Sequence, residues 1–227
     1  TDKQTGYPRP KPVSRFRSIM IDDLGLRSPI VAGGKRVALH GVGKIKFKQH
    51  RPIQGRPKAI RIKLDATGRW FISFCCIDIS PSLKARTGQN VGIDLGVINF
   101  AATSDGDLIA PQRPLRDRSI CLARSQRLLA KRKRGGRRWL VAKQAVARQH
   151  QHIANVRREW HITLARQLVE RYDTIVVERL TIHWLTQSHL GGAIRDMGWV
   201  GFLHWLRVKA EEAGREVIEV DPRGTSQ

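Results

Sequence analysis

Two carboxylates stand at the ends of two short apolar runs, and they are the residues of this chain best suited to chemistry. Asp94 ends the run that begins at Asn90, and Glu178 ends the run that begins at Thr174. A short apolar run bounded by turn residues is typical of a buried strand. A carboxylate held at the end of such a strand is a natural ligand for a hard cation such as Mg²⁺. We therefore expect Asp94 and Glu178 to converge on a shared divalent cation.

The overall charge indicates what this chemistry acts on. The 227 residues include 42 lysines and arginines against 19 aspartates and glutamates, which gives a formal net charge of +23. Such an excess is expected of nucleic-acid binders, because phosphates that pair with cationic side chains release their counterions. A basic protein that is merely soluble, or one bound to an anionic membrane surface, is the alternative. Nucleic acid is the favoured partner.

The composition gives little support to a membrane-bound or secreted protein. No run approaches the roughly eighteen apolar residues of a membrane span, and no secretion signal is visible near the start, so we expect no membrane partner. The three cysteines form neither an even disulfide framework nor a Cys-x-x-Cys metal pair. They fit a reducing compartment, and we expect a cytoplasmic, nucleoid-associated protein.

The basic residues are concentrated between residues 113 and 138, where Asp117 is the one acid. A helical pattern from about 119 to 171, broken at the two glycines 135 and 136, predicts two helices here. Arginine forks match phosphate oxygens, so a nucleic-acid backbone is the economical partner for this block. A solvated linker around the glycines is the alternative. The candidate nucleic-acid-binding residues of this region are Arg124, Arg127, Lys131, Arg132, Lys133, Arg134, Arg137, Arg138 and Lys143.

Residues 1–88 are predicted to be β-rich. Polar and apolar residues alternate over 15–22 and again over 36–48, and residues 59–74 form a strong hairpin candidate. Several short strands joined by turns favour a small barrel or sandwich. Lys44, Lys46 and Lys48 share one face of the strand predicted over 36–48, and they are further candidates for nucleic-acid binding. A solvated outer face is the alternative for these lysines.

The pattern changes after the polar, turn-rich segment that ends near residue 89. A strand, a hairpin over 99–110, the two basic helices, a strand, a helix and a last strand follow in that order. Strands that alternate with helices indicate an α/β layer fold. The helix near residue 198 has an apolar face, and Gly214 is its expected stop. That face comprises Trp199, Phe202, Leu203, Leu206, Ala210 and Ala213.

Several sequence features in this order resemble the TnpB family of transposon-encoded, RNA-guided DNA endonucleases, which are related to type V CRISPR effectors. They are GIDLG at 92–96, the basic two-helix region, IVVE at 175–178 and DPRGTSQ at 221–227. By this resemblance Asp94 matches the first catalytic aspartate and Glu178 the catalytic glutamate. Both would hold two Mg²⁺ ions for phosphodiester hydrolysis, which two-metal sites support by activating water and stabilising the leaving oxygen.

The resemblance also implies an architecture and partners. A β-barrel wedge domain (OB-like) is expected over 1–88. An RNase H-like, RuvC-type nuclease domain is expected over 89–227, with a basic helical insertion at about 113–171. A guide RNA and a target DNA would be the partners.

The sequence departs from the family pattern in three places. The third catalytic aspartate of the family lies beyond a zinc ribbon, which follows a Thr-Ser-Gln segment like the one at 225–227, so we expect a truncated copy here. Zinc is expected only in that ribbon. Arg179 and Thr181 replace the Asp and Asn that are common after the glutamate, and Asp221 is not favoured as a substitute ligand.

Two other functions remain open. A TnpB-like protein without nuclease activity would bind guide and target and block access to the DNA. A sugar-kinase, actin or chaperone-type ATPase also begins its phosphate loop with a sequence like GIDLG, and fold alone does not fix function. Such ATPases need a second lobe and a second phosphate loop, for which this chain has neither the length nor the glycine pattern.

Overall fold

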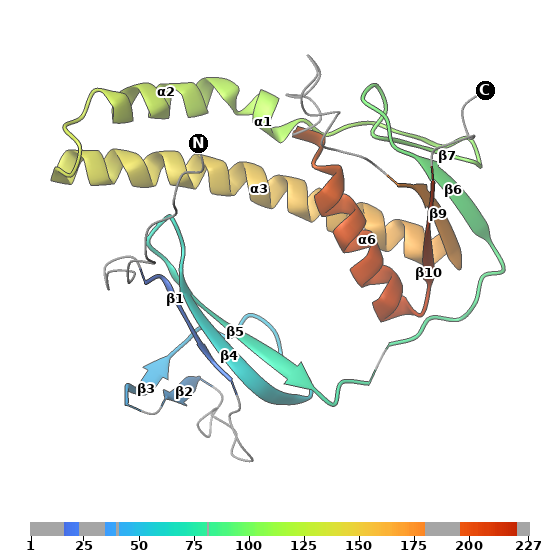
Figure 1. Ribbon diagram of the computed structural model, residues 1–227, viewed down its shortest axis with the longest axis horizontal. Coiled ribbons are helices and arrows are strands. Elements are labelled where there is room, and N and C mark those ends of the chain that lie inside the picture. Colours follow the sequence, from blue (N-terminus) through green and yellow to red (C-terminus); the bar gives the residue numbers. More distant parts are fainter. Residues whose placement is uncertain (1–15, 23–34, 40, 81, 180–195, 222–227) are drawn as a thin grey trace, which may run out of the picture. The chain divides into compact units, whose positions relative to one another are not determined.

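A computed structural model of the chain describes residues 16–22, 35–39, 41–80, 82–179 and 196–221 (Figure 1). Thr181 and residues 222–227, on which part of the sequence comparison rests, lie outside the described residues. The chain divides into two compact units, Thr1–Ser80 and Pro81–Gln227. Each unit is described by itself.

The first unit contains two antiparallel sheets. Strand β4 (Arg56–Leu64) lies between β1 (Ser18–Ile21) and β5 (Trp70–Ile77) in a three-stranded sheet, and β2 (Arg36–Leu39) pairs with β3 (Gly43–Lys46). One apolar cluster joins the sheets, because Val37 and Leu39 of β2 are buried with Ile60 of β4. The described strands therefore give two packed sheets, and a closed barrel stays a prediction.

The prediction of a single strand over 36–48 is wrong, because the chain reverses direction there. Strands β2 and β3 form a hairpin in which Arg36 lies opposite Lys46 and Leu39 opposite Gly43. Gly41 and Gly43 have φ angles of 72° and 95°, which side chains other than glycine rarely adopt. These glycines allow the tight turn. Lys44 and Lys46 lie on β3, whereas Lys48 follows the end of the strand.

The second unit is built on a five-stranded mixed sheet. The strand order is β10-β9-β6-β7-β8. Strands β6 (Asn90–Asp94), β9 (Thr174–Glu178) and β10 (Glu216–Val220) run parallel to one another. Strands β7 (Ala101–Thr103) and β8 (Leu108–Ile109) complete the sheet as the antiparallel hairpin predicted over 99–110.

The described residues of this unit form the helices α1 (Pro114–Asp117), α2 (Ser119–Ala130), α3 (Arg137–Arg171) and α6 (Trp199–Ala213). Figure 1 shows α2 and the first part of α3 side by side as a helical hairpin, with α6 crossing the second part of α3. The connection between α2 and α3 contains the two glycines that predicted a break, and Gly135 has a φ of 87°. The short helix α1 was not predicted.

The core lies between the sheet and the helices α3 and α6. Val91, Ile93, Ile175 and Val177 of the sheet are buried in one cluster with apolar residues of both helices. All six residues of the predicted apolar face of α6 are buried. Gly214 ends α6 with a φ of 70°, as expected of a glycine helix stop.

The segment before β6 is held by the second unit through hydrogen bonds. The Lys84 N–H donates to the Ala213 carbonyl over 3.0 Å, and Arg215 Nη2 donates to the Ala85 carbonyl over 2.7 Å. Asp173 accepts hydrogen bonds from the N–H groups of Thr87 and Gly88. The Thr87 N–H in particular lowers the pKa of Asp173 from its ordinary value. The units accordingly divide before this segment, whereas the predicted boundary lay after it.

Within the described part of the chain, no helix has both the length and the apolar character needed to cross a membrane.

Candidate active site and nucleic-acid interface

Asp94 and Glu178 are the last residues of two neighbouring parallel strands. Strand β6 pairs with β9 from Asn90 opposite Thr174 to Ile93 opposite Val177. Asp94 and Glu178 follow that last pair directly, and each remains in the sheet through its other neighbour, Ala102 of β7 and Val220 of β10. The strand register therefore brings the two carboxylates to the same edge of the sheet.

The alternation of side chains places both carboxylates on one face of the sheet. Val91 and Ile93 are buried in β6, as are Ile175 and Val177 in β9, and they pack against α3 and α6. Successive residues of a strand point to opposite faces. Asp94 and Glu178 therefore point away from these two helices. Asp94 is exposed and Glu178 is half-buried.

A tight turn fixes the chain just beyond Asp94. The Gly96 N–H donates to the Phe100 carbonyl over 3.2 Å, which closes the turn between β6 and β7. A Cβ at Gly96 would lie 3.1 Å from the Asn99 carbonyl oxygen, so a larger residue would push against the backbone of the turn. Inside β6, the Gly92 N–H donates to Ser104 Oγ over 3.1 Å. Strand and turn together hold the backbone that carries Asp94.

These two side chains form a donor set that fits Mg²⁺ in part. Both offer hard carboxylate oxygens, and their partial exposure leaves room for the water ligands that Mg²⁺ retains. Among the residues that the structure describes, no group of three or more metal-ligating side chains is present. The described sheet edge therefore offers two candidate protein ligands, and their role in metal binding stays a prediction.

Asp221 is not expected to supply a third. It directly follows Val220, which lies opposite Glu178 in the parallel pair β10–β9. Asp221 lies just beyond the end of β10, and continued alternation would place its side chain on the face opposite to Glu178. That Asp221 is not a substitute ligand stays a prediction.

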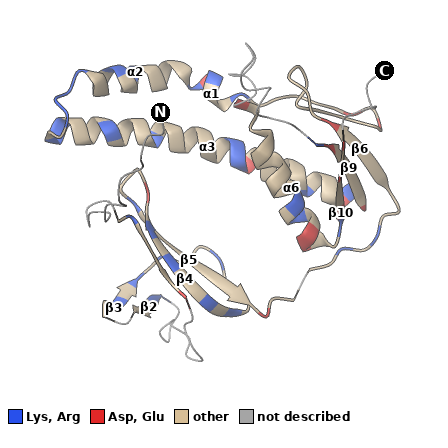
Figure 2. Cartoon of the chain, viewed as in Figure 1, with Lys and Arg blue, Asp and Glu red and all other residues tan. Residues whose placement is uncertain are grey.

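The nine basic residues predicted to bind nucleic acid lie on α2, on α3 and on the connection between them. All nine are exposed, and Figure 2 shows lysines and arginines along both helices and at their junction. Within the described ranges, no carboxylate forms an ion pair with any of the nine. Lys143 lies over the Trp139 ring, with its Nζ 5.0 Å from the ring centroid. An exposed cationic surface of this kind is available to phosphates.

The lysines of the first unit occupy the β2–β3 hairpin. Lys44, Lys46 and Lys48 are exposed, and an open hollow lined by Lys35, Lys46, Lys48 and Arg51 lies beside them. Arg36 lies opposite Lys46 across the hairpin, so the cationic face is wider than the sequence indicated. Their part in binding stays a prediction.

The sequence analysis overlooked Asp196, a buried acid at the junction of three helices. Its carboxylate accepts hydrogen bonds from the N–H groups of Leu115 and Arg116 at the start of α1, over 3.0 and 3.1 Å. It also pairs with Arg157 of α3 over 3.2 Å, and it stands three residues before α6. The signal in the sequence was an isolated acid just before an apolar helix, in a strongly basic chain.

His161 lies beside this junction in the core. It is 2% exposed, and its Nε2 lies 2.9 Å from the Met197 carbonyl, so the ring donates an N–H there. Burial lowers the His161 pKa to about 4, because the apolar core disfavours the charged ring. His161 is therefore a neutral core residue.

Comparison with known proteins decides the family. A family model described as Probable transposase (OrfB_IS605) matches residues 73–189, which is more than half of the chain. The chain belongs to this family. The finding confirms the TnpB resemblance seen in the sequence.

Two relatives of this OrfB_IS605 member have names that describe RNA-guided DNA endonucleases. The chain is 32% identical over 179 residues to one from Streptomyces pristinaespiralis, which covers 78% of this chain and 44% of that protein. It is 26% identical over 208 residues to InsQ of Escherichia coli (strain K12), which covers 85% of this chain and 52% of InsQ. The chain thus spans about half the length of these relatives.

A solved structure supports the fold. The match is to Cas12f1 in a complex with sgRNA and target DNA, with a TM-score of 0.54 and 18% sequence identity. It covers 75% of this chain and 37% of that chain. The OrfB_IS605 member therefore has a TnpB/Cas12-like fold.

Proposed function

We propose that this protein is an RNA-guided DNA endonuclease of the TnpB type, in which Asp94 and Glu178 hold the divalent cations needed for phosphodiester hydrolysis. The observation that carries the proposal is the register of β6 and β9, which leaves the two carboxylates side by side at one sheet edge. The names of the two relatives support the same reaction and the same partners, a guide RNA and a target DNA.

The second unit is proposed to be the RNase H-like, RuvC-type nuclease domain. Support comes from its mixed sheet, in which an antiparallel hairpin β7–β8 and the parallel strands β9 and β10 flank the central β6. The basic insertion between β8 and β9 then corresponds to α1, α2 and α3. The first unit is proposed to be the wedge domain, and support comes from its two packed β-sheets.

The residues of the site have separate roles in this proposal. Asp94 and Glu178 would hold Mg²⁺, which supplies Lewis acidity to a phosphodiester and lowers the pKa of a bound water. The turn closed by the hydrogen bond from the Gly96 N–H to the Phe100 carbonyl would keep the Asp94 carboxylate at the strand end. The arginines and lysines of α2 and α3 would hold the nucleic-acid backbone through charge-assisted hydrogen bonds.

A second candidate function follows from the ligand count. Asp94 and Glu178 are the two carboxylates that end paired strands at the described sheet edge. A site with two ligands that binds metal weakly would give a protein that holds guide and target without cutting them. Binding without cleavage is therefore the alternative.

A cleavage assay on the chain, expressed together with the RNA of its own locus, separates these functions. We expect Mg²⁺-dependent cutting of a matched DNA that disappears in Asp94→Ala and in Glu178→Ala, with RNA binding retained. Each loss should exceed about a hundredfold, because removing a charged metal ligand costs several kcal/mol of transition-state stabilisation. Retained DNA binding without any cutting by the unaltered chain would favour the alternative, and cutting by either variant at the unaltered rate would remove that residue from the site.

A further inference from the structure

A cleft lies where α1 and the beginning of α2 meet α3. It is about 540 Å³ in volume, and its walls are the segment 111–118 on one side and His152 and Val156 of α3 on the other. Three of the lining side chains are arginines, Arg113, Arg116 and Arg118, whereas Asp117 is the one carboxylate among the lining residues. The cleft therefore carries a positive charge.

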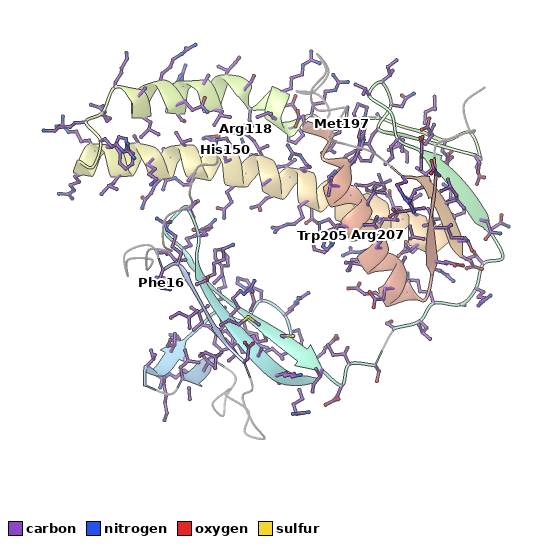
Figure 3. All side chains as sticks on the ribbon, viewed as in Figure 1. Phe16, Arg118, His150, Met197, Trp205 and Arg207 are labelled. Carbon is purple, nitrogen blue, oxygen red and sulfur yellow. The ribbon has the colours of Figure 1, made fainter. Side chains whose placement is uncertain are left out.

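One arginine of the cleft is oriented by a neighbour that is not an acid. Arg118 Nη2 lies 3.0 Å from His152 Nε2, and Figure 3 shows Arg118 at the start of α2 beside α3. An arginine can only donate, so His152 accepts through Nε2 and carries its proton on Nδ1. This contact fixes one N–H of the guanidinium but leaves its charge uncompensated. The remaining N–H groups stay available to an anion.

A second arginine connects the cleft to the candidate active site. Arg113 Nη2 donates to the Val97 carbonyl over 3.2 Å, and Val97 belongs to the turn that directly follows Asp94. The wall of the cleft is thus attached to the loop that leaves the metal-ligand strand.

The nearest buried acid does not neutralise these arginines. Asp196 uses its oxygens on the backbone of α1 and on Arg157. Within the described ranges, Arg113, Arg116 and Arg118 form no ion pair with a carboxylate. A charge that the protein leaves uncompensated in a cleft favours an anionic ligand.

We propose that this cleft binds one backbone phosphate of a nucleic-acid strand, with Arg118 as the principal donor. The inference rests on the proposed function and adds a specific subsite to it. A guanidinium that is fixed in orientation matches the oxygens of a phosphodiester. The His152 ring, which contacts Arg118, is the one aromatic side chain among the lining residues, so the cleft offers no broad aromatic platform on which a base would stack.

The test is the salt dependence of single-strand binding. Fluorescein-labelled strands of about twelve thymidylates or uridylates, a length typical of single-strand sites, are titrated with the 227-residue chain in EDTA. We expect Arg118→Ala to weaken binding about tenfold and to reduce the slope of log K against log salt by about 0.7, the loss of one phosphate contact on a single strand. The DNA and RNA arms identify which strand supplies the phosphate.

Two further variants keep the result decisive. Arg166→Ala removes one exposed arginine of α3 outside the cleft, and we expect it to change the affinity less than twofold. Arg118→Lys keeps the charge but loses the fork, so we expect weaker binding with a slope close to that of the unaltered chain. If thermal unfolding shows that Arg118→Ala is destabilised, the affinity and salt slope of Arg118→Lys alone test the proposal.

The proposal is overturned if Arg118→Ala and Arg166→Ala have equal effects on both strands, or if Arg118→Lys binds like the unaltered chain. The assay contains no divalent cation, so its outcome is independent of cleavage. A failure of the nuclease proposal and a failure of the phosphate subsite are therefore separate results.

Discussion

His161 shows how a single core residue makes this fold sensitive to acid. Its ring lies against Phe100, Trp160 and Phe202, and its N–H donates to the Met197 carbonyl. The core favours the neutral form of the ring, because a charge in this core would lose its hydration.

We predict that acid destabilises the protein through His161. The folded pKa is about 4 against 6.5 for the ordinary residue, so the unfolded chain binds the proton first as the pH falls. The stabilisation is complete above pH 6.5 and is lost between pH 6.5 and 4, by about 3 kcal/mol at the lower limit. Urea unfolding at several pH values should show this loss.

His161→Phe provides the control, because it fills the same aromatic site without titrating. It should be less stable at pH 7, where it lacks the hydrogen bond to Met197, but its stability should fall less steeply toward pH 4. Equal pH slopes in the two proteins would assign the acid sensitivity to the carboxylates, such as Asp173, instead.

At the same scale, the catalytic candidates could be predicted and the supporting residues could not. Asp94 and Glu178 each end an apolar run, so their place at a strand end follows from local sequence. Asp196 owes its role to partners that are distant in the sequence. Arg157 is 39 residues away, and Leu115 and Arg116 at the start of α1 are 81 and 80 residues away. No local pattern contains such contacts.

At the scale of elements, Asp196 joins the basic helical hairpin to the core. It binds the backbone of α1 and the Arg157 side chain of α3. Only Met197 and Gly198 separate it from the start of α6. Gly198 is required there, since its φ is 64° and a Cβ would lie 2.7 Å from Arg157 Cδ. The joint therefore depends on a buried charge and a close backbone approach.

We predict that Asp196→Asn destabilises the protein by about 3 kcal/mol, because the half-buried Arg157 guanidinium loses the counter-charge of a buried carboxylate. The midpoint of thermal unfolding should fall by roughly 10 °C for a chain of this size. Calorimetry measures the shift. Glu159→Gln, which removes an exposed charge from α3, should shift it by less than about 2 °C. Similar shifts in the two variants would show that the Asp196 contacts do not fasten the joint.

The elements themselves were predicted unevenly, for reasons that lie in the chain. The break between α2 and α3 was visible because two adjacent glycines interrupt a long helical pattern. The sequence predicts one strand where β2 and β3 form a hairpin, because the polar–apolar alternation continues on both sides of the turn and the period alone does not reveal a reversal. Helix α1 is a single turn that depends on Asp196, and its length is too short for a periodic signal.

At the scale of the whole molecule, the two compact units divide before the segment 82–89. The boundary predicted from polar composition fell after this segment. Composition indicated a linker, but Arg215, whose side chain is 1% exposed, donates to the Ala85 carbonyl and pairs with Asp173 over 2.6 Å. These long-range contacts make a polar segment part of the second unit.

We predict that the second unit is more stable when it begins at residue 82 than when it begins at residue 90. Removal of 82–89 leaves the buried Arg215 without the Ala85 acceptor and Asp173 without its Thr87 and Gly88 donors. The loss should be about 2–4 kcal/mol, the usual cost of buried polar groups that lose their partners. Urea unfolding of the two truncated chains measures it. Equal stabilities would place the boundary where the sequence predicted it.

The proposed nuclease function requires that Asp94 and Glu178 ligate the same cation. A double-mutant cycle on Mn²⁺ binding tests this most directly. Calorimetric titration would compare the unaltered chain with Asp94→Asn, Glu178→Gln and the double variant, and with Glu212→Gln as an exposed control on α6. We predict that each single variant weakens binding at least about tenfold, or about 1.4 kcal/mol. The double variant should bind Mn²⁺ no more weakly than the single variant with the lower affinity, because losses of affinity at two residues that hold the same cation are not additive. Losses that add, or a single variant that binds Mn²⁺ like the unaltered chain, would contradict a shared site.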